Sequence, residues 1–157
     1  MTRVFQFIFG LVFAICLGIY PAIAVERPFD FTGTGTLEVM TDDNGQLSDG
    51  ILNASGTATH LGKWTQTGTL TFTLDQSNPA IILTSGDSKF IAANGDELDA
   101  QIKDSELDTM TGIATGTFLF VGGTGRFEQA QGSADFTVTQ DLNSGTFDVV
   151  AQGKIDY

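Results

Sequence analysis

Cysteine, histidine and basic residues are scarce in this chain, and each shortage excludes a class of protein. The 157 residues include one Cys and one His, which allow no intramolecular disulfide and no His-rich metal site. Only seven Lys and Arg stand against 19 Asp and Glu, a formal net charge of −12. Such a chain repels nucleic-acid phosphates and anionic membrane surfaces. Hydrophobic residues make up 41% and charged residues 17%, which excludes simple disorder and indicates one folded domain.

The first 24 residues have the layout of a secretory signal peptide. Arg3 precedes the apolar stretch 4–20, and Ala22 and Ala24 follow at the spacing of a cleavage site. We expect cleavage after Ala24 and a secreted or periplasmic protein. An uncleaved membrane anchor is the alternative, because the apolar run is close to spanning length. A lipid anchor on Cys16 is disfavoured, since Leu17 stands where a small residue is expected.

Cleavage at this point would leave residues 25–157 as a single domain without any cysteine. This part keeps all 19 acidic residues and six basic ones, a net charge of −13. A domain of this size can bury roughly two-thirds of its unfolded surface, so it can fold without disulfides. The high negative charge favours solubility, and after cleavage we expect no association with a membrane.

Alternation of residue types predicts that residues 25–157 are all β. Residues 64–74, WTQTGTLTFTL, place five Thr on one face and Trp64, Leu70 and Phe72 on the other. Asn94-Gly95 predicts a hairpin with a type I′ turn, in which both residues have positive φ. The pattern indicates eight or nine strands, near 30–40, 50–60, 64–75, 80–85, 88–93, 96–104, 113–121, 132–140 and 146–156. We predict an antiparallel barrel rather than a sandwich, because closure removes exposed strand edges.

A glycine-rich stretch at 121–136, VGGTGRFEQAQGSADF, resembles the GGTG-[KR]-F-x-x-A-x-G signature of plant dirigent proteins. The stretches GTATHLGKW at 56–64 and NGDEL at 94–98 resemble runs in a secreted bacterial branch of the same superfamily. The resemblance implies the eight-stranded antiparallel β-barrel that dirigent proteins share with allene oxide cyclases. It also implies a cavity that holds an apolar molecule in one conformation. Dirigent-type barrels are often oligomeric, which leaves a homo-oligomer open.

The glycines of this motif are expected to shape a loop rather than to bind phosphate. They permit positive φ and a sharp reversal of the chain, which would let Phe127 plug one end of the barrel. No helix pattern and no GK[ST] sequence follows them, as a phosphate-binding loop would require.

Three residues are candidates for ligand binding: His60, Trp64 and Arg126. His60 is the only imidazole and could act as a general acid or base beside a carboxylate, or could simply hydrogen-bond the backbone. Trp64 could stack on a ligand, but it shares a face with apolar residues and core packing is the alternative. Arg126 could hold an anion or pair with a nearby acid. The carboxylates that could partner His60 are Asp96, Asp99 and Asp135.

The most direct functional hypothesis is non-catalytic binding of a small apolar ligand, or service as an extracellular structural module. The alternative is a cofactor-free isomerase or cyclase of the allene oxide cyclase or dirigent type, and a surface interaction protein is a third class. The catalytic residues of those families do not fall within the matched motifs. Tyr157 is the only Tyr after residue 24, which argues against a Tyr acid. We expect no cofactor and no metal, since the acidic turns lack EF-hand spacing. The contents of the barrel interior should discriminate these hypotheses.

Overall fold

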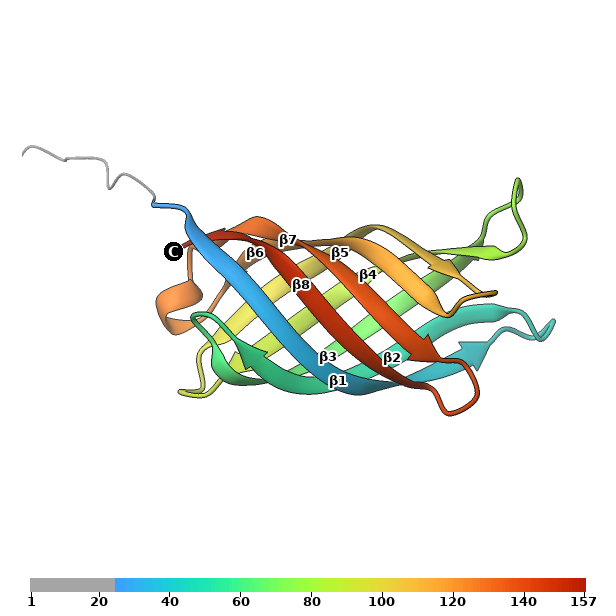
Figure 1. Cartoon of the computed structure of the whole chain (residues 1–157), viewed down its shortest axis with the longest axis horizontal. Coiled ribbons are helices and arrows are strands. Elements are labelled where there is room, and N and C mark those ends of the chain that lie inside the picture. The colour runs from blue at the N-terminus through green and yellow to red at the C-terminus, as the bar shows by residue number, and fades with distance from the viewer. Residues whose placement is uncertain (1–24) are drawn as a thin grey trace, which may run out of the picture.

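Eight long strands follow one another around a closed barrel, each antiparallel to its neighbours, and β8 pairs with β1 to complete it (Figure 1). The computed structural model describes residues 25–157, so the predicted signal peptide and its cleavage site lie outside the described residues. The all-β, eight-stranded antiparallel barrel is confirmed. The strands are β1 (Arg27–Thr41), β2 (Leu47–Ala58), β3 (Gly62–Leu74), β4 (Ile81–Ala92), β5 (Glu97–Asp108), β6 (Ile113–Gly123), β7 (Gln131–Asp141) and β8 (Thr146–Asp156).

The prediction of separate strands at 80–85 and 88–93 is wrong, because β4 runs through both without a break. It stays in register with β3 over its whole length, and its pairing with β5 shifts between Thr84 and Gly86. A Cβ on Gly86 would lie 2.0 Å from the Thr69 carbonyl oxygen. The glycine therefore marks a bulge and a close backbone approach within one strand.

The hairpin at Asn94-Gly95 is present, but its predicted type I′ turn is wrong. Gly95 has φ of +90°, and the only non-glycine residues with positive φ between Val25 and Tyr157 are His60 and Asp104. Gly95 N donates to Ala92 O at 2.9 Å, and Ala92 N donates to Asp96 O at 2.8 Å. The loop is therefore longer than two residues and needs only one left-handed position.

The two ends of the barrel differ. At one end β1 begins, β8 finishes, and the short 3₁₀ helix η1 (Gly125–Phe127) folds across the opening beside the C-terminus (Figure 1). We call this the η1 end. The opposite end carries the connections 42–46, 75–80, 109–112 and 142–145, and we call it the open end.

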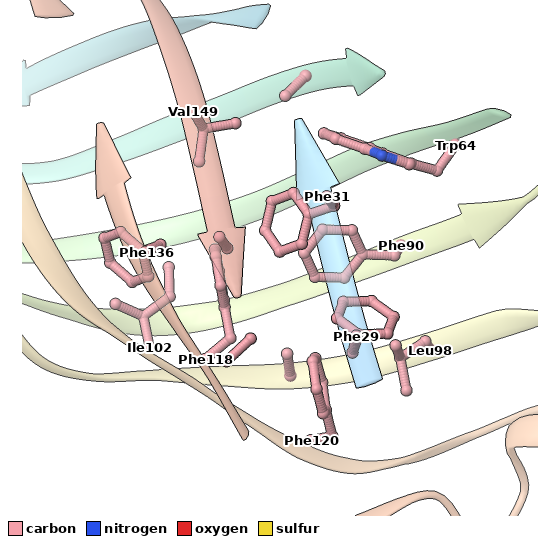
Figure 2. Close-up of a cluster of buried hydrophobic side chains, with 14 of the residues drawn as sticks. Phe29, Phe31, Trp64, Phe90, Leu98, Ile102, Phe118, Phe120, Phe136 and Val149 are labelled. Atoms are coloured by element: carbon pink, nitrogen blue, oxygen red, sulfur yellow. The ribbon is translucent and has the colours of Figure 1, made fainter. Parts of the chain in front are cut away.

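Aromatic side chains fill the half of the barrel nearer η1 (Figure 2). Phe31 lies at the centre of this group, with its ring centroid 5.5 Å from those of Trp64 and Phe90. Most of these pairs meet edge to face, the favoured geometry for aromatic rings. A Cβ on Gly33 would lie 2.5 Å from the Trp64 ring, so the glycine makes room for the indole.

Candidate ligand site in the barrel

Two of the sequence motifs dock onto each other at the η1 end. Thr124 N donates to Glu97 O at 2.8 Å, and Glu97 N donates to Thr124 Oγ1 at 2.9 Å. Gly125 has φ of +57°, and a Cβ there would overlap the Asp96 carboxylate. The glycine-rich loop therefore needs its small residues to seat against the hairpin at 94–98.

Arg126 links this loop to the third motif. Its Nη2 donates to the His60 carbonyl oxygen, and its Nε lies 3.6 Å from Asp96 Oδ2. The guanidinium also lies 4.8 Å from the centroid of the Phe127 ring. The side chain is 39% exposed, so the ion pair with Asp96 contributes little to stability. Arg126 therefore pairs with a neighbouring acid, Asp96, which is the alternative predicted for it.

His60 lies in the turn between β2 and β3, with φ of +67°. Its Nε2 is 3.0 Å from the Pro28 carbonyl oxygen, and because a carbonyl only accepts, Nε2 carries the proton. The ring packs edge-on against Tyr157 at 5.6 Å. The hydrogen-bond partner of Nε2 is thus the backbone rather than a carboxylate. The arrangement ties the turn to the start of β1 and forms no acid–base pair.

Phe127 plugs the η1 end as expected. Its side chain is fully buried, and its ring centroid lies 5.0 Å from that of Tyr157. Arg27 covers the Tyr157 ring at 4.6 Å. His60 and Arg126 therefore lie together at the plugged end of the barrel. Their side chains hydrogen-bond to backbone carbonyl oxygens and pack against Tyr157 and Phe127.

Trp64 lies apart from the other two candidates. Only 2% of it is exposed, and Phe31, Phe90 and Gly33 surround its indole in the aromatic core. Among residues 25–157, its Nε1 is the one buried side-chain nitrogen or oxygen without a hydrogen-bond partner. The placement matches the alternative of core packing.

A small cavity of about 70 Å³ lies inside the barrel towards the open end. Half-buried Leu37, Gln140 and Phe147 form its outer part, close to the open-end connections. Sixteen residues from all eight strands line it: Leu37, Leu52, Gln66, Leu70, Phe72, Thr84, Ile102, Ser105, Leu107, Ala114, Phe118, Phe136, Val138, Gln140, Phe147 and Val149.

The polar groups of this cavity are all neutral. Gln66 and Ser105 are buried in its wall, and Thr84 and Gln140 are half-buried nearer the mouth. Gln66 Nε2 donates to the buried Ser88 Oγ at 2.7 Å. None of the described residues in the lining ionises near neutral pH. The cavity can bind an apolar group and offer it hydrogen bonds, but it holds no general acid or base.

None of the three candidate residues His60, Trp64 and Arg126 lines this cavity. Gln66 carried a usable signal, since it lies on the otherwise apolar face of the strand at 64–74. A polar side chain on a buried face usually has a hydrogen-bond partner inside the fold. Thr84, Ser105 and Gln140 carry no comparable signal, because only barrel closure brings their strands around one space.

Acidic residues begin or border each connection at the open end. Asp42 Oδ1 accepts hydrogen bonds from the backbone of Gln46 and Asn44, which lower its pKa. The Ser77 hydroxyl and backbone N–H lower the pKa of Asp75. The Asn143 backbone N–H, followed by the Ser144 hydroxyl, lowers the pKa of Asp141. These carboxylates therefore stay ionised to more acidic pH than ordinary Asp.

The acids do not gather into a metal site. Within the described range 25–157, no group of three or more His, Cys, Asp or Glu is placed to hold a metal ion. In the same range no helix has the length and apolar character needed to cross a membrane.

Strand order, closure and the plugged end together define a dirigent-like eight-stranded β-barrel fold. No family model matches the sequence, and no curated protein does. Six chains of solved structures match, among them that of the pterocarpan synthase dirigent protein GePTS1. The two chains share 15% sequence identity and a TM-score of 0.57, over 87% of this chain and 94% of the other. At this identity the likeness shows the fold alone.

Proposed function

We propose that residues 1–24 are a signal peptide that directs export of this protein. We propose further that the protein binds a small apolar molecule, without catalysing a reaction, in the cavity near the open end. It would then be a non-catalytic member of the secreted bacterial branch that the motifs at 56–64 and 121–136 resemble. The observation that carries the proposal is the lining of the cavity, which combines apolar walls with a few neutral hydrogen-bonding groups.

The size of the cavity limits how a ligand can bind. Pockets that enclose drug-sized ligands measure about 300–1,000 Å³, whereas this one measures about 70 Å³. A ligand would therefore insert one slender apolar end and leave the remainder at the mouth. The packed aromatic side chains in the other half of the barrel support a structural role for the η1 end.

The isomerase or cyclase alternative has less support. Such a barrel would work by positioning its substrate, helped by one or two groups that move a proton. The lining offers only amides and hydroxyls for that purpose. The imidazole of His60 is hydrogen-bonded at the other end of the barrel.

Native mass spectrometry of the protein from its own host, followed by organic extraction, tests the proposal. We expect a co-purifying apolar molecule, and NMR titration with 1-hexanol should shift the signals of Gln66 and other cavity residues. Ala114→Leu should abolish both results, because Ala114 lines the cavity. Thr115→Leu is the matched control, since Thr115 lies next to it on the outer face. The proposal would be contradicted if the purified protein carried no ligand and the NMR signals of the cavity residues did not shift on addition of 1-hexanol.

A further inference from the structure

The inner face of β5 is irregular where the strand borders the cavity. Up to Ile102 every second residue of β5 is buried, as the alternation of a regular strand requires. Lys103 and Asp104 are then both exposed, and the buried positions resume one residue late, at Ser105. The pairing of β5 with β6 shifts over the same residues. The strand therefore carries a bulge at Lys103 and Asp104.

This bulge determines which side chain of β5 faces the cavity. Without it, regular alternation would turn Asp104 and Glu106 inward. With it, both acids are exposed and Ser105 lines the cavity. Asp104 has φ of +48°, in the left-handed region that non-glycine residues seldom adopt, and such strain is concentrated at functional sites. The bulge thus keeps two carboxylates out of the cavity wall and puts a neutral hydroxyl into it.

A second hydroxyl lies next to that of Ser105. Thr84 is the β4 residue that pairs directly with Ser105, and both residues line the cavity. Side chains at directly paired positions of antiparallel strands have Cβ atoms about 4.5–5.5 Å apart. Both hydroxyls can therefore reach the same ligand atom.

Gly116 on β6 provides space for this arrangement. A Cβ at Gly116 would lie 2.7 Å from the Cβ of Ser105 and 2.7 Å from the Phe136 ring. Because Ser105 and Phe136 both line the cavity, any larger residue at this position would displace them. The glycine therefore allows Ser105 to sit in the wall without filling the space in front of it.

Within residues 25–157, neither the Ser105 nor the Thr84 hydroxyl has a hydrogen-bond partner, although Ser105 is only 5% exposed. In the same range Trp64 Nε1 is the one fully enclosed polar side-chain atom without a partner, so these hydroxyls are not sealed in the packing and border the cavity. Burying a hydroxyl without a hydrogen bond costs free energy. A ligand atom that accepts its hydrogen removes that cost.

The lining also restricts the charge of that ligand atom. No residue around the cavity ionises near neutral pH. A carboxylate or an ammonium group placed there would lose its hydration without meeting an opposite charge. A carbonyl or hydroxyl oxygen needs no opposite charge, and its two lone pairs can accept from two hydroxyls.

We propose that Ser105 and Thr84 together bind a neutral oxygen atom of the ligand, a carbonyl or hydroxyl oxygen close to its inserted apolar end. The inference rests on the proposed function and adds to it the polar group that the ligand carries. Along β5, Ser105 lies between Leu107, nearer the open end, and Ile102, deeper in the barrel. The oxygen is therefore bound partway into the cavity, beyond which only a short apolar group fits.

Two probes of the same shape test the inference: 2-pentanone and 2-methyl-1-pentene, in which a CH₂ group replaces the carbonyl oxygen. Both should shift the NMR signals of the cavity residues. Ser105→Ala should weaken the binding of the ketone about fivefold, as expected for the loss of one hydrogen bond, and should leave the affinity for the alkene unchanged. Thr84→Val, which keeps the shape of the side chain and removes its hydroxyl, should act in the same way.

The matched control is Ser85→Ala, because Ser85 follows Thr84 on the outer face of β4. It should change neither affinity. Binding of the alkene shows in each variant that the cavity is intact, so a variant that fails to fold is recognised by the loss of both probes and is replaced by the other.

The outcomes separate the inference from the proposed function. Unchanged ketone affinity in both hydroxyl variants, or an equal loss of ketone and alkene affinity in a folded variant, would overturn the inference and leave apolar binding intact. If neither probe shifted the cavity signals of the wild-type protein, the proposed function itself would be overturned, and the assignment of Ser105 and Thr84 with it.

Discussion

Individual polar residues show that rarity in the sequence says little about the place of a side chain in the fold. His60 and Arg126 stand out in the sequence because imidazoles and basic side chains are rare in it. In the fold each satisfies a backbone carbonyl, of Pro28 and of His60 respectively. Gln66 is inconspicuous among five threonines, yet together with Ser105 it is a buried polar group in the wall of the cavity. Burial, which the sequence indicates only indirectly, decides which of these side chains lines the interior of the barrel.

The contact between Gly33 and Trp64 gives a prediction at this scale. Gly33→Ala would bring a methyl group within 2.5 Å of the indole and 2.6 Å of the Ser55 carbonyl oxygen. We expect a loss of about 1–3 kcal/mol in the free energy of unfolding, measured by urea denaturation. Combining it with Trp64→Phe should cost at least about 0.5 kcal/mol less than the sum of the single changes, because the smaller ring relieves the clash.

Thr34→Ala is the control for that experiment, since Thr34 is the exposed neighbour of Gly33 on β1. It should change the free energy of unfolding by no more than about 0.5 kcal/mol. Strict additivity of the Gly33 and Trp64 substitutions would show that the indole does not limit the space at Gly33.

At the scale of elements, the four open-end connections share one device. Each has an Asp whose carboxylate accepts a backbone N–H two residues further on, which fixes the start of the turn. The sequence revealed the turns through their Asp, Asn, Ser and Gly residues. It gave the wrong turn type at Asn94-Gly95, because the dipeptide signal does not specify loop length. The length of this loop depends on where β4 ends and β5 begins, which is set by the pairing of both strands with their neighbours.

These turns predict a specific dependence of stability on pH. Hydrogen bonds lower the folded-state pKa of Asp42, Asp75 and Asp141 below 3.8. Their charged forms therefore stabilise the fold above about pH 3.8, and the contribution is lost as the pH falls through the lower folded values. Replacing all three by Asn removes the titrating charge and keeps an acceptor.

Urea unfolding of wild type and this triple variant from pH 2 to pH 6 measures the effect. The part of the stability difference due to ionisation should be largest near pH 6 and should decrease as the pH falls through the lowered pKa values. Asp43→Asn, in the same connection as Asp42, is the control, because the turn hydrogen bonds of this connection are made to the Asp42 carboxylate and none to that of Asp43. A difference that stays constant over this range would contradict the assignment.

At the scale of the molecule, repulsion between the many carboxylates destabilises the fold, and core packing stabilises it. The aromatic core and the closed ladder of strands hold together a domain with 19 acidic and six basic residues. The open end carries carboxylates without basic partners in its connections, so self-repulsion is concentrated there. The η1 end tolerates its charges better, because Arg126 and Lys154 lie close to Asp96 and Glu26.

Salt should therefore stabilise the described domain. Screening shortens the range of repulsion from about 30 Å at 0.01 M to about 3 Å at 1 M ionic strength. We expect Tm of residues 25–157 to rise by on the order of 3 °C between these limits, measured by calorimetry. A variant in which Asp42, Asp75, Asp108 and Asp141 are replaced by Asn should show a smaller rise in Tm than wild type. A Tm that falls with NaCl would mean that attractive pairs outweigh the repulsion.

The sequence by itself determined the all-β class, the barrel and the plug at Phe127. Period-two alternation, turn residues and the glycine-rich motif are local properties, and each acts through neighbours in the chain. The joining of β4 across Gly86, the separation of Trp64 from His60 and Arg126, and the cavity came only from the tertiary structure. Each of these depends on which side chains share the interior once eight strands close, and contacts between distant strands leave no periodic trace in the chain.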